Sequence, residues 1–173
     1  MNNKTRRIAL CAMLAAMFEC LSLISINLGS MKITLDFLPI IIAAMLFGPV
    51  EGAIVGLAGS FLNQLLSYGL TPTTILWILP AGVRGLLVGL YAKKHSFSLT
   101  RGQTVFILIL SALVVTALNT GVMYLDSVII GYPFAATLIT VVLRIVNGIL
   151  TAILFAFILP MVIERLRKFA EEK

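Results

Sequence analysis

The chain has 173 residues, of which 60% are hydrophobic and only 12% charged, with a mean hydropathy of +1.09. A soluble domain carries roughly 25% charged residues. A chain this short cannot bury so much apolar surface in a water-soluble core, so a soluble globular protein is excluded. The net charge of +6 does not indicate nucleic acid, because the basic residues gather on one predicted side of a membrane. We therefore expect an all-α membrane protein whose residues 1–173 form a single transmembrane domain of about six spans.

The first predicted helix covers residues 8–28 and follows a basic N-terminal segment. It is too long for the apolar part of a signal peptide, Glu19 interrupts it, and no polar cleavage region follows it. The next residues, GSMKITLDF at 29–37, are polar at alternate positions and rich in turn residues. They predict an extended loop between the first two helices.

A short second helix is predicted over residues 37–47, because Gly48-Pro49 follows and proline disfavours a helical conformation at the residue before it. At 1.5 Å per residue, this helix crosses only about half of the hydrocarbon core. Longer helices are then predicted at 50–68, at 72–92, at 104–125 and from residue 134 onward, the last ending in an amphipathic tail.

The positions of the basic residues predict the orientation of the chain. Ten of the 13 Lys and Arg residues lie in the N-terminal segment, in the loop KKHSFSLTRGQ between the fourth and fifth helices, and in the C-terminal tail. With six spans these regions share one side, which the positive-inside rule makes cytoplasmic. Both termini are therefore predicted to be cytoplasmic. The loops 29–36, 69–72 and 126–133, the last a predicted turn, face outward.

Three charged residues are predicted in the middle third of the bilayer: Glu19, Arg84 and Arg144. A charge at this depth costs about 2.5–3.5 kcal/mol on translocon scales and is usually paired or faces a watery cavity. Two arginines against one glutamate leave a surplus positive charge, which with nearby amides and an aromatic ring suits a pocket for a small, planar, anionic ligand. The predicted substrate-binding residues are Arg84, Arg144, Asn119, Asn147, Trp77, Asn63, Gln64, Glu19 and, in the first outer loop, Lys32.

The same polar residues also allow a purely structural interpretation. In this alternative Glu19 pairs with one arginine, and the Asn and Gln side chains join helices. Interhelical polar bonds contribute only about 0.6 kcal/mol on average, and they are common in membrane proteins without any role in binding.

Small residues recur at helical spacing on three predicted helices, a pattern that lets helices approach closely. On the third and fourth helices this pattern favours packing inside the chain, whereas the stripe on the first helix could instead face another protein. The stripes are Ala9, Ala12, Ala16 and Cys20 on the first helix, Gly52 and Gly56 on the third, and Ala81, Gly85 and Gly89 on the fourth.

The sequence contains no catalytic constellation and no Walker motif. No metal site is expected, because Cys11 and Cys20 are isolated in one apolar segment and His95 is the only histidine. We therefore predict a protein that is not an enzyme and holds no cofactor of its own. If it takes part in transport, the energy comes from elsewhere.

The chain also resembles a known family of membrane proteins. A small, basic-ended, six-helix protein with an Ala12-x-x-x-Ala16 motif is similar to the substrate-binding S components of bacterial energy-coupling factor (ECF) vitamin transporters. The block LDFLPIIIAAMLFGPVEGAIVGLAGSFLNQLL, 35–66, is similar to the helix two–three region of that family. The resemblance implies a multi-pass protein of the bacterial cell membrane that captures a vitamin in a pocket covered by its outer loops.

The resemblance also implies partners. Ala12 and Ala16 would contact a transmembrane coupling (T) subunit. Two cytoplasmic ATPase subunits would use ATP to tilt the S component and deliver the vitamin inward.

The segments LNTGVMYLDSVIIGYPF and VVLRIVNGI are similar to the folate-binding branch of this family. On that resemblance Asn119 would read the pterin edge or an amide, and Arg144 would hold a carboxylate. The segment SYGLTPTTILWILP departs from the aromatic, glycine-rich pattern of that branch. Riboflavin, pantothenate, thiamine, and pyridoxine- or pyrimidine-type compounds therefore stay open as alternatives. A standalone secondary transporter is a further alternative, but it needs a titratable relay, for which Glu19 alone qualifies.

Overall fold

The computed structural model of the chain describes residues 3–24, 26–28, 31–33, 35–131, 142, 145–146, 148–153, 155, 157 and 159. The described positions from 142 to 159 are all helical. The elements before them are α1 (Asn3–Leu23), β1 (Ile26–Leu28), β2 (Met31–Ile33), α2 (Phe37–Leu46), α3 (Pro49–Tyr68), α4 (Thr74–Lys94) and α5 (Arg101–Ile130).

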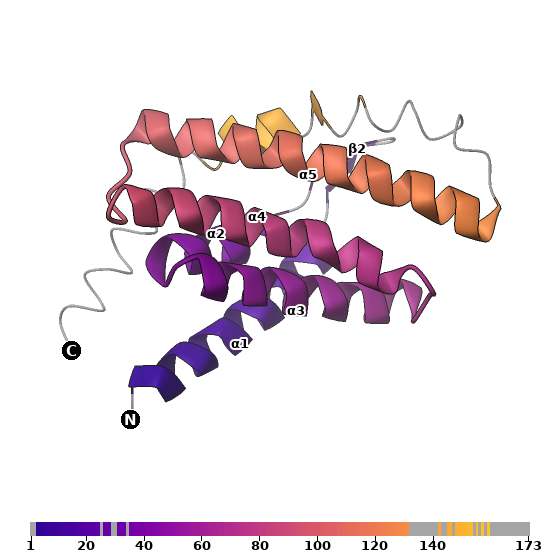
Figure 1. Cartoon of the computed structure of the whole chain (residues 1–173), viewed down its shortest axis with the longest axis horizontal. Helices are drawn as coiled ribbons and strands as arrows, with labels where there is room; N and C mark the ends of the chain where they lie inside the picture. Colours follow the sequence, from indigo (N-terminus) through magenta and orange to yellow (C-terminus); the bar gives the residue numbers. More distant parts are fainter. Residues whose placement is uncertain are drawn as a thin grey trace.

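The helices are stacked around α4, which contacts α2, α3 and α5. Figure 1 shows α4 between α5 on one side and α2 and α3 on the other, with α1 crossing obliquely against α2 and α3. The N-terminus and the α4–α5 connection lie at the same end of the bundle (Figure 1). This end therefore carries two of the three basic regions that the sequence placed together.

The short helix α2 lies at the centre of the bundle. All residues from 39 to 45 are buried, as expected for a helix that is apolar on every side. It ends before Gly48, whose φ of +120° favours glycine, and Pro49 then opens α3 at a position where its missing N–H costs nothing. The predicted short second helix is confirmed.

The contact between α3 and α4 depends on glycine. A Cβ added to Gly56 would lie 2.7 Å from the backbone carbonyl carbon of Ala81, and one added to Gly85 would lie 2.6 Å from the backbone nitrogen of Ala53. Neither distance is available to a real side chain, so the helices pack backbone against backbone. The prediction that the small residues of these two helices pack inside the chain is confirmed.

Two boundaries differ from the sequence prediction. The first helix ends at Leu23, and part of the predicted extended loop forms an antiparallel hairpin that pairs Ile26 with Ile33 and Leu28 with Met31. The predicted all-α class therefore needs this small correction. Polar residues at alternate positions fit a paired strand as well as a loop, so the alternation did not distinguish the two. A helix of hydrophobic residues can also end without a specific sequence signal, so the end of α1 was not predicted.

The predicted turn at 126–133 is wrong for residues 126–130, because α5 continues through them. The helix ends where Gly131 adopts the left-handed conformation, φ +87°, and its N–H donates to Ser127 O at 2.8 Å. Asp126 does not interrupt the helix, because its carboxylate accepts a hydrogen bond from the neighbouring α3–α4 segment.

Two of these helices, Thr74–Lys94 and Arg101–Ile130, are long and apolar enough to cross a membrane, and α2 is a shorter apolar helix. Many large apolar side chains on the outside of the bundle are exposed, among them Leu86, Leu90, Phe106 and Leu110. Such side chains suit contact with lipid.

Candidate functional site

Arg84 is buried in the middle of α4, about 15 Å from the start of the helix at the standard rise. Only 7% of its surface is exposed, and its Nε has no hydrogen-bond partner among the described residues. Its guanidinium carbon lies 3.7 Å from the centroid of the Phe37 ring. A desolvated cation–π contact of this kind contributes about 2 kcal/mol, which offsets part of the cost of burying the charge.

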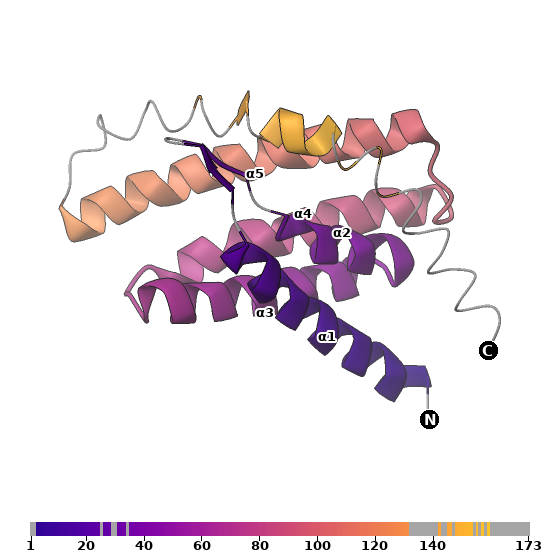
Figure 2. The same cartoon turned by 180° about the vertical axis from the view of Figure 1, so that it is seen from behind.

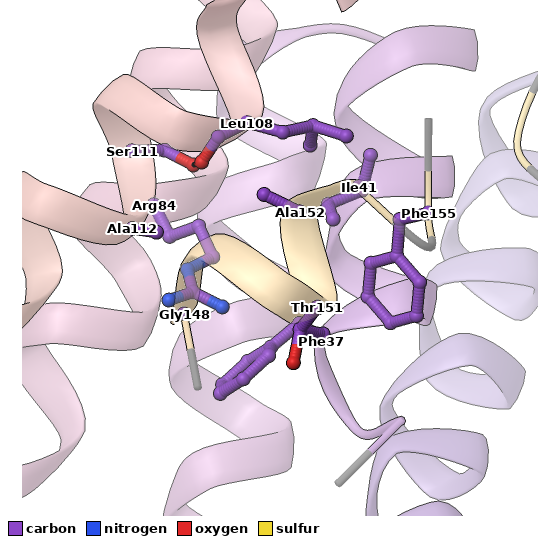
Figure 3. Close-up of a pocket in the computed structure, with 10 residues that line it drawn as sticks. All are labelled: Phe37, Ile41, Arg84, Leu108, Ser111, Ala112, Gly148, Thr151, Ala152 and Phe155. Carbon is purple, nitrogen blue, oxygen red and sulfur yellow. Dashed lines mark hydrogen bonds between the residues drawn. The ribbon is translucent and has the colours of Figure 1, made fainter. Parts of the chain in front are cut away.

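A small cavity opens beside Arg84 (Figure 3). Its volume of about 20 Å³ is enough for one water-sized group, whereas pockets that hold whole ligands measure roughly 300–1,000 Å³. The cavity can therefore receive one water-sized group, such as a single oxygen atom of a ligand, and any larger part of a ligand requires that the surrounding side chains move apart. Its lining consists of Phe37, Ile41, Arg84, Leu108, Ser111, Ala112, Gly148, Thr151, Ala152 and Phe155.

The lining joins four parts of the chain that are far apart in sequence. Helix α2 supplies the aromatic ring and α4 the guanidinium, while hydroxyl groups come from Ser111 on α5 and Thr151 on the C-terminal helical residues. In Figure 3 the guanidinium, the Phe37 ring and the Thr151 hydroxyl lie together. The Ser111 hydroxyl already donates to Leu108 O at 2.9 Å, so the buried cation among apolar walls is the group suited to binding a negatively charged oxygen group.

The acidic residue that acts on Arg84 is Asp36, which the sequence analysis did not single out. Its carboxylate contributes an attractive charge at Arg84, but no ion pair within 4 Å joins these two residues. Asp36 is the N-cap residue of α2, yet its side chain makes no capping hydrogen bond. Its position before a short helix is typical of a cap, so no local signal distinguished it from one.

Glu19 lies in a different environment. It is 7% exposed, and its Oε2 accepts a hydrogen bond from Ser22 Oγ at 3.3 Å, while Asn63 Nδ2 donates to the same Ser22 oxygen at 2.7 Å. The other carboxylate oxygen, Oε1, has no partner in the described part of the chain. This network connects α1 to α3. The alternative in which Glu19 pairs with Arg84 is wrong.

Ion pairing among the described residues occurs elsewhere. Arg7 Nη1 lies 3.5 Å from Glu51 Oε1, at the end of the bundle where α1 and α3 begin. The pair is largely exposed on the arginine side, so it contributes little to stability.

The structure does not gather all the predicted binding residues at one place. Trp77, Gln64 and Asn119 are half-buried, and none of them belongs to the described lining of the cavity. The backbone of Lys32 lies in β2, opposite Asn27. The last two predicted residues, Arg144 and Asn147, lie outside the described residues.

A second polar cluster, which the sequence analysis missed, connects the α3–α4 segment to α5. Thr73 Oγ1 donates to Asp126 Oδ1 at 2.5 Å, and both residues are buried. Thr71 N donates to Thr74 Oγ1 at 2.8 Å in the same turn. The pattern TPTT was a visible signal for a turn, but nothing in the sequence paired it with an acid 53 residues later.

The small-residue stripe of α1 faces away from the bundle. Ala12 and Ala16 are exposed, whereas Cys11, Ala15 and Phe18 on the opposite face are buried. Phe18 packs where Gly59 leaves room on α3. The stripe is therefore exposed to contact with another protein. Of the two alternatives for the first helix, packing inside the chain and contact with another protein, the structure fits the second.

The sequence of the chain is similar to that of a known protein family. The sequence pattern of the "ECF-type riboflavin transporter, S component" family matches residues 2–165, which is nearly the whole chain. The chain belongs to this family. S components are substrate-binding subunits of transporters and not enzymes, and they are membrane proteins.

Relatives with similar sequences are UPF0397 proteins of Streptococcus and Leuconostoc species. The protein of Streptococcus pneumoniae serotype 19F (strain G54) is 31% identical over 147 residues, which cover 80% of this chain and 79% of that protein. The protein of Streptococcus thermophilus (strain ATCC BAA-491 / LMD-9) is 28% identical over 101 residues, and the match spans 57% of this chain and 54% of the relative.

Two solved structures share the fold. "Structure and mechanism of the S component of a bacterial ECF transporter" aligns with a TM-score of 0.68 at 21% identity, covering 97% of this chain and 99% of that one. "Crystal structure of FolT bound with folic acid" aligns with a TM-score of 0.66 at 22% identity, covering 94% and 96%. At these identities the likeness establishes the helical S-component fold.

Proposed function

We propose that this chain is the substrate-binding subunit of an ECF importer, which captures a vitamin at the outer face of the bacterial cell membrane. Membership of the S-component family supports this proposal. The observation that carries it is Arg84, a buried guanidinium beside a small, mainly apolar cavity, whose Nε has no hydrogen-bond partner among the described residues. A membrane protein tolerates such a group where it serves a ligand.

Our leading substrate is folate. Folate combines a flat heteroaromatic ring with a negatively charged glutamate tail, which would place a carboxylate on Arg84. The fold likeness to FolT bound with folic acid supports this choice, as does the similarity of the segments 118–134 and 141–149 to the folate branch. In this proposal Arg144, Asn119 and Asn147 complete the site from the fifth and sixth helices.

Riboflavin is the second candidate, because the matching family is named for riboflavin transporters. Riboflavin is uncharged at neutral pH, so it makes less use of a buried guanidinium. The two candidates therefore differ in the charge that they bring to Arg84.

The partners follow from the same proposal. The exposed face of α1 with Ala12 and Ala16 docks on a T subunit, and two ATPases on the cytoplasmic side drive the delivery step. Both chain termini would then be cytoplasmic, in line with the N-terminus and the basic α4–α5 connection lying at one end of the bundle.

The test is ligand binding by the purified protein in detergent, without ATP or an ion gradient. Folate and riboflavin are compared by titration calorimetry, and uptake is measured in vesicles with and without the T and ATPase subunits. Tight binding of one vitamin together with subunit-dependent uptake is the expected result. Uptake by the chain alone would refute the assignment.

Arg84→Met sharpens this test. Removing one partner of a buried charge pair costs about 2–5 kcal/mol, so folate affinity should fall at least about 30-fold, while riboflavin affinity changes much less. Arg101→Met, at the exposed start of α5, is the matched control and should leave both affinities unchanged. Equal folate binding by wild type and Arg84→Met would mean that Arg84 is structural.

A further inference from the structure

Arg84 is a buried cation to which the described part of the chain supplies no directly contacting counter-charge. Its side chain is 7% exposed, and its Nε donates to no acceptor in the residues that the structure describes. The ion pair recorded among these residues joins Arg7 to Glu51 at the end of the bundle. An arginine keeps its proton in a protein. A positive charge therefore remains in the middle of α4, where a charge is normally paired.

The cavity beside this charge (Figure 3) has the size of one small ion. Its volume is about 20 Å³, which is close to the space that a single water molecule needs. A chloride ion is only slightly larger than a water molecule, whereas a carboxylate, phosphate or sulfate group contains several heavy atoms. The cavity as it stands therefore admits a monatomic anion and excludes polyatomic ones.

The surroundings of the cavity favour an anion over a water molecule. Apart from Arg84, the polar side chains in its described lining are Ser111 and Thr151, and the Ser111 hydroxyl donates to Leu108 O at 2.9 Å. A water molecule can accept the Nε proton, but it leaves the positive charge unbalanced. An anion does both, and its attraction to the guanidinium is strong between apolar walls, because the local dielectric constant is low.

We propose that this cavity binds a chloride ion, which balances the charge of Arg84 while no vitamin is bound. The negatively charged group of the vitamin then displaces the chloride as the surrounding side chains move apart, so that the site exchanges one anion for another. The chloride site follows from the cavity and the buried charge alone, whereas the exchange rests on the proposed function.

The first experiment measures the melting temperature of the vitamin-free protein in detergent, in sodium chloride or in sodium gluconate. Gluconate is too large for the cavity, and equal ionic strength keeps the screening of surface charges the same. A ligand that binds only the folded state stabilises it, so chloride should raise the melting temperature by about 2–4 °C. Bromide, also monatomic, should act like chloride. Equal melting temperatures in chloride and gluconate overturn the proposal.

Two variants separate the charge from the space. Arg84→Met removes the cation, and Ala112→Val narrows the cavity that Ala112 lines while it keeps the cation, so each should abolish the chloride effect. Arg101→Met, at the exposed start of α5, is the matched control and should retain the full effect. If Arg84→Met cannot be purified, Arg84→Gln replaces it. A chloride effect that persists in either cavity variant places the ion elsewhere and overturns the proposal.

Anomalous diffraction from crystals grown in bromide locates the ion directly. A bromide peak beside the Arg84 guanidinium is the expected result, and peaks confined to the surface of the protein overturn the proposal.

The last experiment tests the exchange by titrating the wild-type protein with folate in chloride and in gluconate. Folate affinity should be about fivefold lower in chloride, the competition that corresponds to the expected rise in melting temperature. Equal folate affinity in the two salts overturns the exchange. A protein that binds folate in neither salt refutes the folate assignment instead, and the melting temperatures and the bromide peak then decide the chloride site alone.

Discussion

Two faces of the molecule carry the same sequence pattern and use it differently. In the α3–α4 contact, Gly52 and Gly85 bring two backbones together at distances that no Cβ could occupy. On the outer face of α1, Ala12 and Ala16 are spaced in the same way but stay exposed. Small residues at helical spacing therefore predict that another helix packs closely against them. The pattern does not tell whether that helix belongs to the same chain or to a partner.

The difference arises from what the opposite side of each helix offers. Helix α1 also carries Cys11, Ala15 and Phe18, which are buried, and that larger face is the one that packs on α2 and α3. Helices α3 and α4 carry their glycines on the buried face itself. The larger apolar face is buried inside the chain, and the smaller stripe on α1 stays exposed.

The largest expected effect follows from filling the internal contact. In Gly85→Leu the new Cβ would lie 2.6 Å from Ala53 N, a backbone atom that cannot turn aside. Overpacking of this kind costs about 1–3 kcal/mol or more, so the variant should be aggregated or strongly destabilised. Size-exclusion chromatography and thermal unfolding in detergent measure this, with Gly121→Leu as the control, because a Cβ at Gly121 meets no atom within 4 Å.

A substitution of the same size on the outer face should act on transport alone. Ala12→Leu with Ala16→Leu should leave the melting temperature and vitamin affinity unchanged and abolish uptake with the T and ATPase subunits, because the added side chains prevent close docking. Ala15→Leu, on the buried face of the same helix, should instead lower the melting temperature. Loss of vitamin binding in the first variant would contradict an outward role for the stripe.

The smallest expected effect is the change in stability on loss of one hydrogen bond near the end of α5. Thr73→Val removes the hydrogen bond to the buried Asp126 and should destabilise the protein by about 0.5–1.5 kcal/mol, the typical net contribution of one hydrogen bond. Val128→Thr makes the reverse change at an exposed position and should change stability by less than about 0.5 kcal/mol. Equal melting temperatures for the two variants would mean that the Thr73–Asp126 bond contributes nothing.

Hydropathy and turn residues were sufficient for most of the fold. The short α2 was predictable because Gly48-Pro49 is a local signal, and the α3 and α4 spans follow from long apolar runs between polar breaks. The end of α1 was missed although Gly29-Ser30 between the two strands is a local hairpin signal. The helical course of residues 126–130 was missed because the partner of Asp126 is Thr73, 53 residues away, and local patterns carry no information about such contacts.

The candidate site also has features that the sequence predicted and features that it did not. The sequence by itself determined that the protein is a helical membrane protein, that Arg84 lies deep in a span, and that small residues line helix faces, because burial of apolar residues and the cost of a charge in lipid depend only on residue type. Only the tertiary structure decided that Arg84 meets Phe37 while Glu19 meets Ser22, and which small-residue face stays open. These pairings depend on how helices far apart in sequence are brought into register, and packing of the whole bundle sets that register.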